Sequence, residues 1–108
     1  MNKMMIVVVV AHLTAGVVQA AESTGYRKIV GVGCHIRNDV CFVTLEGSAY
    51  GSTLGCSSTQ ARWSVESTPG GMKNFSLITS AWLAGKEVDL YINGCLGNWP
   101  TFAWANYR

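Results

Sequence analysis

Four cysteines place the strongest constraint on this chain: Cys34, Cys41, Cys56 and Cys95. In an exported protein, an even number of cysteines is typical of a disulfide framework, although four of them permit three connectivities. A zinc site is the competing interpretation, but no CxxC pair occurs and His35 is the only histidine after residue 20. The sequence therefore predicts two disulfides, with no metal and no other cofactor.

The first 20 residues have the pattern of a secretory signal peptide. Lys3 precedes an apolar stretch over residues 4–18, and cleavage is expected after Ala20, with Ala21 as the alternative. A retained membrane helix would need about 20 predominantly apolar residues, whereas this stretch is interrupted by His12, Thr14 and Gly16. We expect residues 1–20 to be removed, leaving residues 21–108 as one secreted or periplasmic domain without a membrane span.

The expected mature chain carries little net charge. Once Lys3 is removed, seven basic and six acidic residues remain, and the basic residues form no cluster. Because nucleic-acid binding relies on a basic surface that follows the phosphates, no nucleic-acid partner is expected. A domain this small also gains only a few kcal/mol from one core, and disulfides commonly compensate in secreted proteins.

Alternation of apolar and polar residues predicts five strands, at 27–36, 40–45, 60–65, 87–93 and 101–107. Gly31 and Gly33 indicate a bend or bulge in the first strand. The turn residues between the first two ranges predict a hairpin. The segment before residue 27 reads as a polar lead-in, residues 46–59 as a loop with at most one irregular edge strand, and residues 94–100 as a second loop.

One helix is expected between the third and fourth strands. Thr68 is suited to the N-cap and Pro69 to the first helical position, and Gly85 is a natural terminator. Apolar residues recur at helical spacing over residues 72–84, notably Phe75, Ile78 and Trp82.

The predicted fold class is mainly β with one helix, in the order strand, strand, strand, helix, strand, strand. This is the chain order of a five-stranded OB-like barrel. A five-stranded sheet with the helix packed across one face is the alternative.

The expected hairpin suggests how the cysteines pair. A short turn between the first two strands sets Cys34 opposite Cys41, at a separation that a disulfide can bridge. Cys56 would then join Cys95 and tie the loop before the third strand to the loop after the fourth. Pairing Cys41 with Cys56 and Cys34 with Cys95 is the alternative.

No group of side chains predicts an enzyme, which would need a positioned nucleophile, an acid or base and an orienting group. His35 reads as a surface or packing residue, and Ser57 and Ser58 lack a GxSxG context. Glu87 and Asp89 share one strand face, whereas a glycosidase holds its two carboxylates across a cleft. A small secreted hydrolase is retained as a third hypothesis only because of this carboxylate pair.

Aromatic residues are numerous for so short a chain, and four of them bear on function. Trp63 and Trp82 are expected in the core, where large rings fill a thin domain. Trp99 and Tyr50 lie in expected loops among glycines and polar residues, where burial is less assured. An exposed ring edged by hydroxyl and amide side chains would offer a platform to the apolar face of a sugar.

Several segments resemble the binding subunits of subtilase cytotoxin and of pertussis-like typhoid toxin. They are the stretch from Glu46-Gly47 through Ser52 and Cys56 to Trp63, the segment 81–92, and Trp99-Pro100-Thr101-Phe102. Glu22, Thr24 and Gly25 match the Glu-x-Thr-Gly near the start of the family's mature domain, while Cys34 and Cys95 are additional to its pattern.

The resemblance implies an OB-fold subunit, a homopentameric ring and recognition of sialylated glycans, with delivery of a separate catalytic subunit. It makes Tyr91 the candidate counterpart of the family's tyrosine after the apolar run of the fourth strand, although a one-residue shift would put Ile92 there. The family's sugar-contacting serine has no clear counterpart in this sequence.

We therefore expect a secreted, non-catalytic module that binds a sialylated or other glycan. The alternative is a stand-alone periplasmic or extracellular domain that binds a protein, as an inhibitor does. Loops on a rigid scaffold commonly carry the contacts, so the candidate glycan-binding residues are Tyr50, Ser52, Ser57, Tyr91, Asn98 and Trp99.

Overall fold

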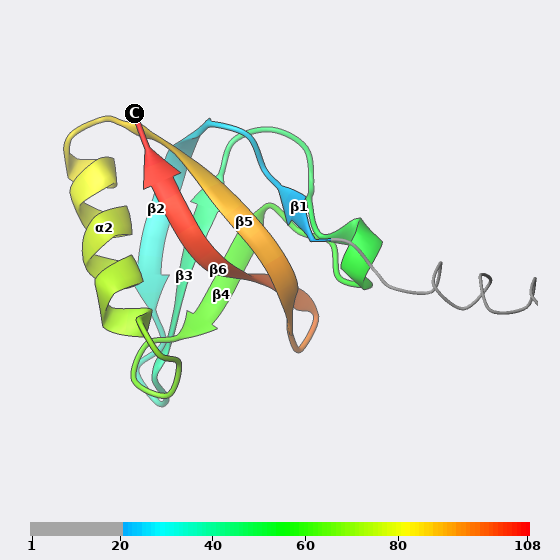
Figure 1. Cartoon of the computed structure of the whole chain (residues 1–108). Helices are drawn as coiled ribbons and strands as arrows, with labels where there is room; N and C mark the ends of the chain where they lie inside the picture. Colours follow the sequence, from blue (N-terminus) through cyan, green and yellow to red (C-terminus); the bar gives the residue numbers. More distant parts are fainter. Residues whose placement is uncertain (1–20) are drawn as a thin grey trace, which may run out of the picture.

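The structure is a computed structural model that describes residues 21–108; the expected signal peptide lies outside the described residues. The described chain is a mainly β domain with one α-helix (Figure 1). No helix in residues 21–108 combines the length and apolar character needed to cross a membrane. The elements in chain order are β1 (Glu22–Ser23), β2 (Arg27–Cys34), β3 (Val40–Leu45), the short 3₁₀ helix η1 (Ser52–Leu54), β4 (Gln60–Ser64), α2 (Gly71–Leu83), β5 (Glu87–Leu96) and β6 (Trp99–Tyr107).

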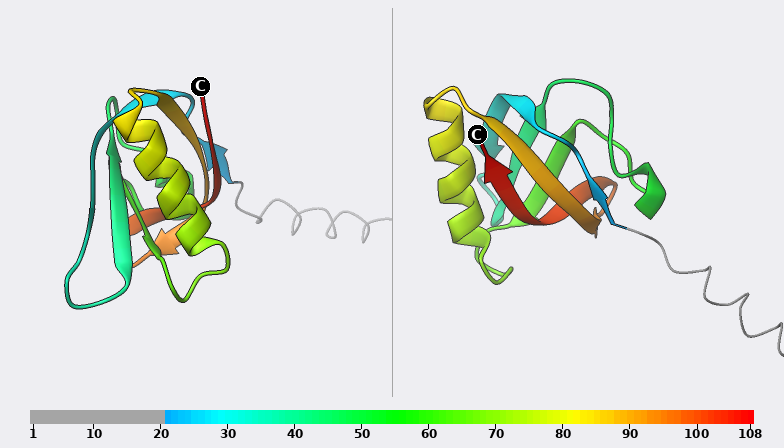
Figure 2. Two further views of the ribbon diagram at one scale, coloured as in Figure 1. Left: turned by 90° about the vertical axis from the view of Figure 1, so that its left-hand side faces the viewer. Right: turned by 45° about the horizontal axis from the view of Figure 1, so that its top comes forward.

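The six strands form one antiparallel sheet that curves around the core. β2, β3 and β4 are hydrogen-bonded in succession, and β5 pairs with β2, β1 and β6. α2 contacts β2, β5 and β6 and lies along one side of the curved sheet (Figure 2). β4 and β6 lie beside each other, but no hydrogen-bonded ladder joins them within residues 21–108. The mainly β class with one helix is confirmed, whereas closure into a barrel is not.

The β2–β3 hairpin and its disulfide match the prediction. Cys34 is directly opposite Cys41, and the two are bonded with their Cα atoms 3.9 Å apart. The pairing register shifts between Ile29 and Gly31, which confirms a bulge in this strand. A side chain at Gly33 would meet the ring of Phe42, so this glycine makes room for an aromatic on the neighbouring strand.

The loop predicted over residues 94–100 is wrong, because β5 and β6 continue through it as a long hairpin. Leu96 pairs with Trp99, leaving Gly97 and Asn98 as a two-residue turn in which Gly97 has a φ of +65°. A Gly-Asn dipeptide between apolar residues is a recognised hairpin signal. The sequence therefore contained the signal for this turn. The lead-in before residue 27 also contains a short strand, β1, which pairs with β5.

The helix begins two residues later than predicted, at Gly71, and Gly70 rather than Thr68 occupies the N-cap position. Gly70 has a φ of +78°, a left-handed conformation that favours glycine. A Cβ on Gly71 would lie 2.4 Å from the carbonyl oxygen of Val65, so the first turn approaches the end of β4 too closely for any side chain. This close approach moves the helix start past Pro69. The helix ends at Leu83, before Gly85, as expected.

One of the two tryptophans expected in the core is there. Trp63 is 2% exposed, packs edge-on against Phe102 and donates from Nε1 to the carbonyl oxygen of Gly71 at 3.0 Å. The prediction for Trp82 is wrong, since this side chain is 42% exposed. The helix buries the side that carries Ile78 and Ala81, and small Ala81 rather than Trp82 meets the sheet.

Candidate ligand-binding site

The second disulfide brings the η1 segment against the tip of the β5–β6 hairpin. Cys56 is bonded to Cys95, with Cα atoms 6.0 Å apart, which confirms the predicted pairing. On the other side of η1, Glu22 accepts a hydrogen bond from the Thr53 hydroxyl at 2.6 Å. This bond is the main reason that the pKa of Glu22 lies below its ordinary value. The segment is thus anchored to β5 by a covalent bond and to β1 by a hydrogen bond.

At this hairpin, an arginine from β4 covers a tryptophan from β6. The guanidinium carbon of Arg62 lies 3.5 Å from the ring centroid of Trp99. Its Nε donates to Oε1 of Gln60 at 2.7 Å, and the Gln60 amide donates in turn to the Thr44 hydroxyl at 3.3 Å. Stacking and this hydrogen-bonded chain fix the plane of the guanidinium. The N–H groups on Nη1 and Nη2 make no hydrogen bond to residues 21–108.

Arg62 and Trp99 line a hollow of about 300 Å³ between the β2–β3 and β5–β6 hairpins. Its other lining residues come from the tips of those hairpins and from the start of β3: His35, Asn38, Val40, Leu96 and Gly97. No acidic side chain is among them, so within the described chain the lining includes no carboxylate to pair with Arg62. The hollow therefore offers fixed, unpaired donors to an incoming acceptor.

The structure separates the residues that the sequence grouped as a binding site. Trp99 lines the hollow, but Arg62 covers one face of its ring, so that face is not an open sugar platform. Asn98 is exposed in the neighbouring turn, while Ser52 and Ser57 are exposed around η1 and do not line the hollow. The segment that carries Ser52 and Ser57 is connected to the β5–β6 hairpin through the Cys56–Cys95 disulfide.

Tyr50 is a core residue rather than a loop contact. Its side chain is 3% exposed, and its hydroxyl donates to the carbonyl oxygen of Thr59 at 2.9 Å. Burial raises the pKa of this phenol above its ordinary value. Since neither ring face is accessible, Tyr50 holds the loop in place instead of meeting a ligand.

Tyr91 lies elsewhere, on the outward face of β5. Its ring is stacked on Trp104 of β6, with centroids 4.8 Å apart and planes 4° from parallel. Tyr91 lies five positions before Leu96 along β5, or roughly 16 Å of extended strand. The Tyr91–Trp104 pair is therefore an aromatic surface distinct from the Arg62–Trp99 hollow.

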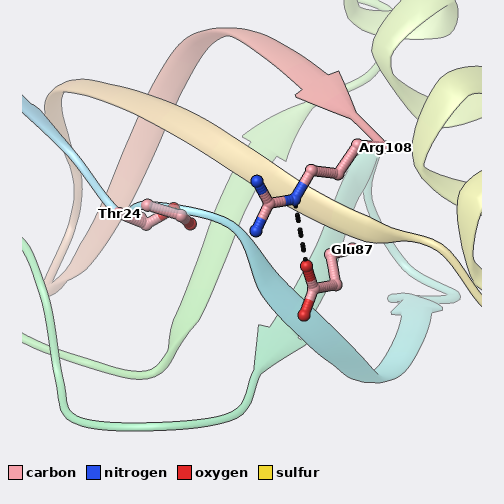
Figure 3. A network of polar contacts seen from close by, with 4 residues as sticks. Thr24, Glu87 and Arg108 are labelled. Atoms are coloured by element: carbon pink, nitrogen blue, oxygen red, sulfur yellow. Dashed lines mark hydrogen bonds and ion pairs between the residues drawn. The ribbon is translucent and has the colours of Figure 1, made fainter.

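The carboxylates of Glu87 and Asp89 each have a structural partner. Glu87 accepts a hydrogen bond from Nε of Arg108 at 3.2 Å, the interaction that Figure 3 marks with a dashed line. Asp89 accepts from the Ser23 hydroxyl and from the backbone N–H of Gly25. Both carboxylates lie two residues apart on one strand and do not face each other across a cleft, so this geometry adds no support for a hydrolase.

Arg62 is the functional candidate that sequence reasoning missed. Arg62 lies between Ala61 and Trp63, which are buried, so the alternation of β4 puts it on the outer face. That pattern gives no reason to place this face beside Trp99, which is 37 residues away in the chain. Only the unpredicted continuation of the β5–β6 hairpin carries the tryptophan to the arginine.

Comparison of the chain with protein-family models, curated proteins and solved structures finds no match. The class that the described residues define is a small antiparallel β domain with one helix and two disulfides.

Proposed function

We propose that this protein is a secreted, non-catalytic glycan-binding module that recognises an acidic glycan, with the Arg62–Trp99 hollow as its binding site. The observation that carries the proposal is the Arg62 guanidinium, which is fixed in place and has unpaired terminal donors. The disulfides and the mainly β fold are compatible with a secreted or periplasmic domain.

A carboxylate is the group that this arginine fits best. A guanidinium presents parallel N–H groups that match the two oxygens of a carboxylate, and such charge-assisted pairs are among the stronger hydrogen bonds in proteins. Because stacking and the bond to Gln60 already fix the side chain, little further conformational entropy is lost when a ligand binds. A volume of about 300 Å³ is at the lower end of ordinary ligand sites and suits one sugar unit.

The resemblance to toxin binding subunits supports the same ligand class, since it implies recognition of sialylated glycans, whose terminal unit carries a carboxylate. Within that proposal the fold is an OB-like barrel, for which the side-by-side position of β4 and β6 is the supporting observation. The ring of five and the separate catalytic subunit rest on the resemblance alone. Mass measurement of the secreted protein at micromolar concentration tests the ring, and a monomer would contradict it.

A protein partner is the second candidate, because the outer side of α2 carries exposed apolar side chains. Met72, Trp82 and Leu83 are 56%, 42% and 78% exposed. Trp82 and Leu83 adjoin at the end of α2, whereas Met72 lies near its start, and adjoining exposed apolar residues commonly mark interaction surfaces. In this alternative the protein acts as a stand-alone binding or inhibitor-like domain.

Glycan-array binding with matched substitutions separates the two candidates. The unsubstituted protein should bind glycans that carry a terminal carboxylate, and Arg62→Gln should weaken that binding at least tenfold, the effect of losing one charged hydrogen-bonded contact. Trp99→Ala should weaken it as well, because the guanidinium loses its support. Lys73→Gln, which removes an exposed positive charge on α2, is the control and should bind as the unsubstituted protein does.

Two results would count against the glycan proposal. The first is no binding to any acidic glycan by correctly oxidised protein; the second is equal losses for Arg62→Gln and Lys73→Gln, which would indicate a general charge effect. Protein capture that Leu83→Ser abolishes and Arg62→Gln leaves unchanged would favour the protein-binding alternative.

A further inference from the structure

A second hollow, of about 380 Å³, lies between the chain that enters α2 and the β5–β6 hairpin. The end of β4 and the following turn contribute Ser64 and Thr68, and the first turns of α2 contribute Asn74. The hairpin contributes Asn93 and Thr101 from its two strands. Figure 1 shows the start of α2 beside the end of β4, where this turn lies.

The polar lining of this hollow is uncharged and unpaired. Two carboxamides and three hydroxyls contribute to it, and no charged residue of the described chain does. None of these five side chains makes a hydrogen bond to another residue in 21–108, in contrast to most polar side chains around η1 and β1. Five polar side chains gathered in one concavity, all without partners, are available to a ligand.

The remaining lining supplies an apolar surface next to these groups. Pro69, Leu96 and Ala103 contribute to it, and Phe102, which is 4% exposed, lies behind them. Phe102 is held by its edge-on contact with Trp63, so this part of the wall is rigid. An amphipathic ligand, with carbon-bound hydrogens on one face and hydroxyls around its edge, matches this arrangement.

We propose that this second hollow binds an uncharged sugar unit. Carboxamides and hydroxyls both donate and accept hydrogen bonds, as vicinal sugar hydroxyls do. A charged group would lose its hydration here without gaining a counter-charge, which disfavours an ion. The hollow therefore complements the Arg62–Trp99 hollow, which takes the acidic unit.

The two hollows adjoin, because Leu96 lines both. A single glycan could therefore place its acidic unit against Arg62 and an uncharged unit between Asn74 and Asn93. This joint binding rests on the proposed function. The second hollow also stands as a site on its own, since none of its polar groups belongs to the first.

Titration of ¹⁵N-labelled, oxidised protein, recovered after export, with uncharged methyl glycosides tests the site. The probes are the methyl glycosides of glucose, galactose, mannose and N-acetylglucosamine, up to about 100 mM, well above the millimolar Kd expected from a few neutral hydrogen bonds. At least one glycoside should shift the side-chain amide signals of Asn74 and Asn93. Arg62→Gln should leave these shifts intact, whereas Asn74→Ala and Asn93→Ala should each weaken binding about fivefold, the loss of one neutral hydrogen bond. An unchanged dispersion of the spectrum shows that each variant is folded.

The outcomes separate this inference from the function on which it rests. Binding of acidic glycans that Arg62→Gln abolishes, with no glycoside moving the Asn74 and Asn93 signals, overturns the second site and leaves the proposed function in place. Shifts at Asn74 and Asn93 without any acidic-glycan binding support the second site and count against the Arg62 proposal. If the Asn93 signal still shifts unchanged in Asn74→Ala, and the Asn74 signal in Asn93→Ala, the assignment of these residues is overturned.

Discussion

The contrast between Trp63 and Trp82 leads to a quantitative prediction about stability. Trp63→Phe removes part of a fully buried ring and the hydrogen bond that it donates to Gly71. A residual cavity of roughly 40 Å³, at about 24 cal/mol per Å³, costs about 1 kcal/mol. Losing the indole hydrogen bond costs about 0.5–1.5 kcal/mol more, because the Gly71 carbonyl still accepts a hydrogen bond within α2. The free energy of unfolding should therefore fall by about 1.5–2.5 kcal/mol, and Tm by roughly 8–14 °C for a domain of this size.

The matched control is Trp82→Phe, the same chemical change on an exposed helix position. It should alter the free energy of unfolding by no more than about 0.5 kcal/mol. The measurement is urea unfolding of the oxidised variants, followed by circular dichroism at 222 nm because tryptophan fluorescence itself changes. Equal losses for the two variants, or a loss below about 1 kcal/mol for Trp63→Phe, would refute the account of how β4 holds the start of α2.

Two further predictions concern covalent and electrostatic links. In the chain-entropy model, replacing Cys56 and Cys95 together by alanine should lower the free energy of unfolding by about 4 kcal/mol, because this disulfide spans 39 residues. Replacing Cys34 and Cys41 should lower it by about 2.5 kcal/mol, because that disulfide spans 7 residues. Denaturant titration measures both losses, and the reverse order would contradict the model. Hydrogen bonds from Ser67 lower the pKa of the Asp39 carboxyl below its ordinary 3.8. The carboxylate therefore stabilises the fold above pH 3.8, and this stabilisation is lost as the pH falls through the lowered pKa. Asp39→Ala should therefore destabilise the protein at pH 7 and progressively less below pH 3.8, as thermal melts over that range would show; a pH-independent difference would exclude the carboxylate as the cause.

Much of the fold could be predicted because local patterns and tertiary packing agree in most of the chain. The alternation of β3 places Cys41, Val43 and Leu45 inward, and all three are buried. The hairpin turn fixed the first disulfide by register, and the second pairing then followed by elimination. The helix start was not predictable from capping preference, because the close approach of Gly71 to Val65 is a tertiary contact.

The site was harder to predict than the fold. The sequence predicted Trp99 as a glycan-binding residue, on the expectation that its ring is exposed. Whether that face is free depends on Arg62, from a strand that does not pair with β6. The amide-lined hollow likewise joins Asn74 of the helix to Asn93 of the hairpin. Contacts between non-paired elements leave no periodic signature in the chain.

Leu96 lines both hollows, so it can couple ligand binding in one hollow to ligand binding in the other. A ligand that displaces this side chain on entering one hollow changes the shape of the other. Any coupling free energy that results must be reciprocal, so occupancy of either site alters the affinity of the other by the same factor. Leu96→Ala would remove this mechanical connection while leaving the polar groups of both sites in place.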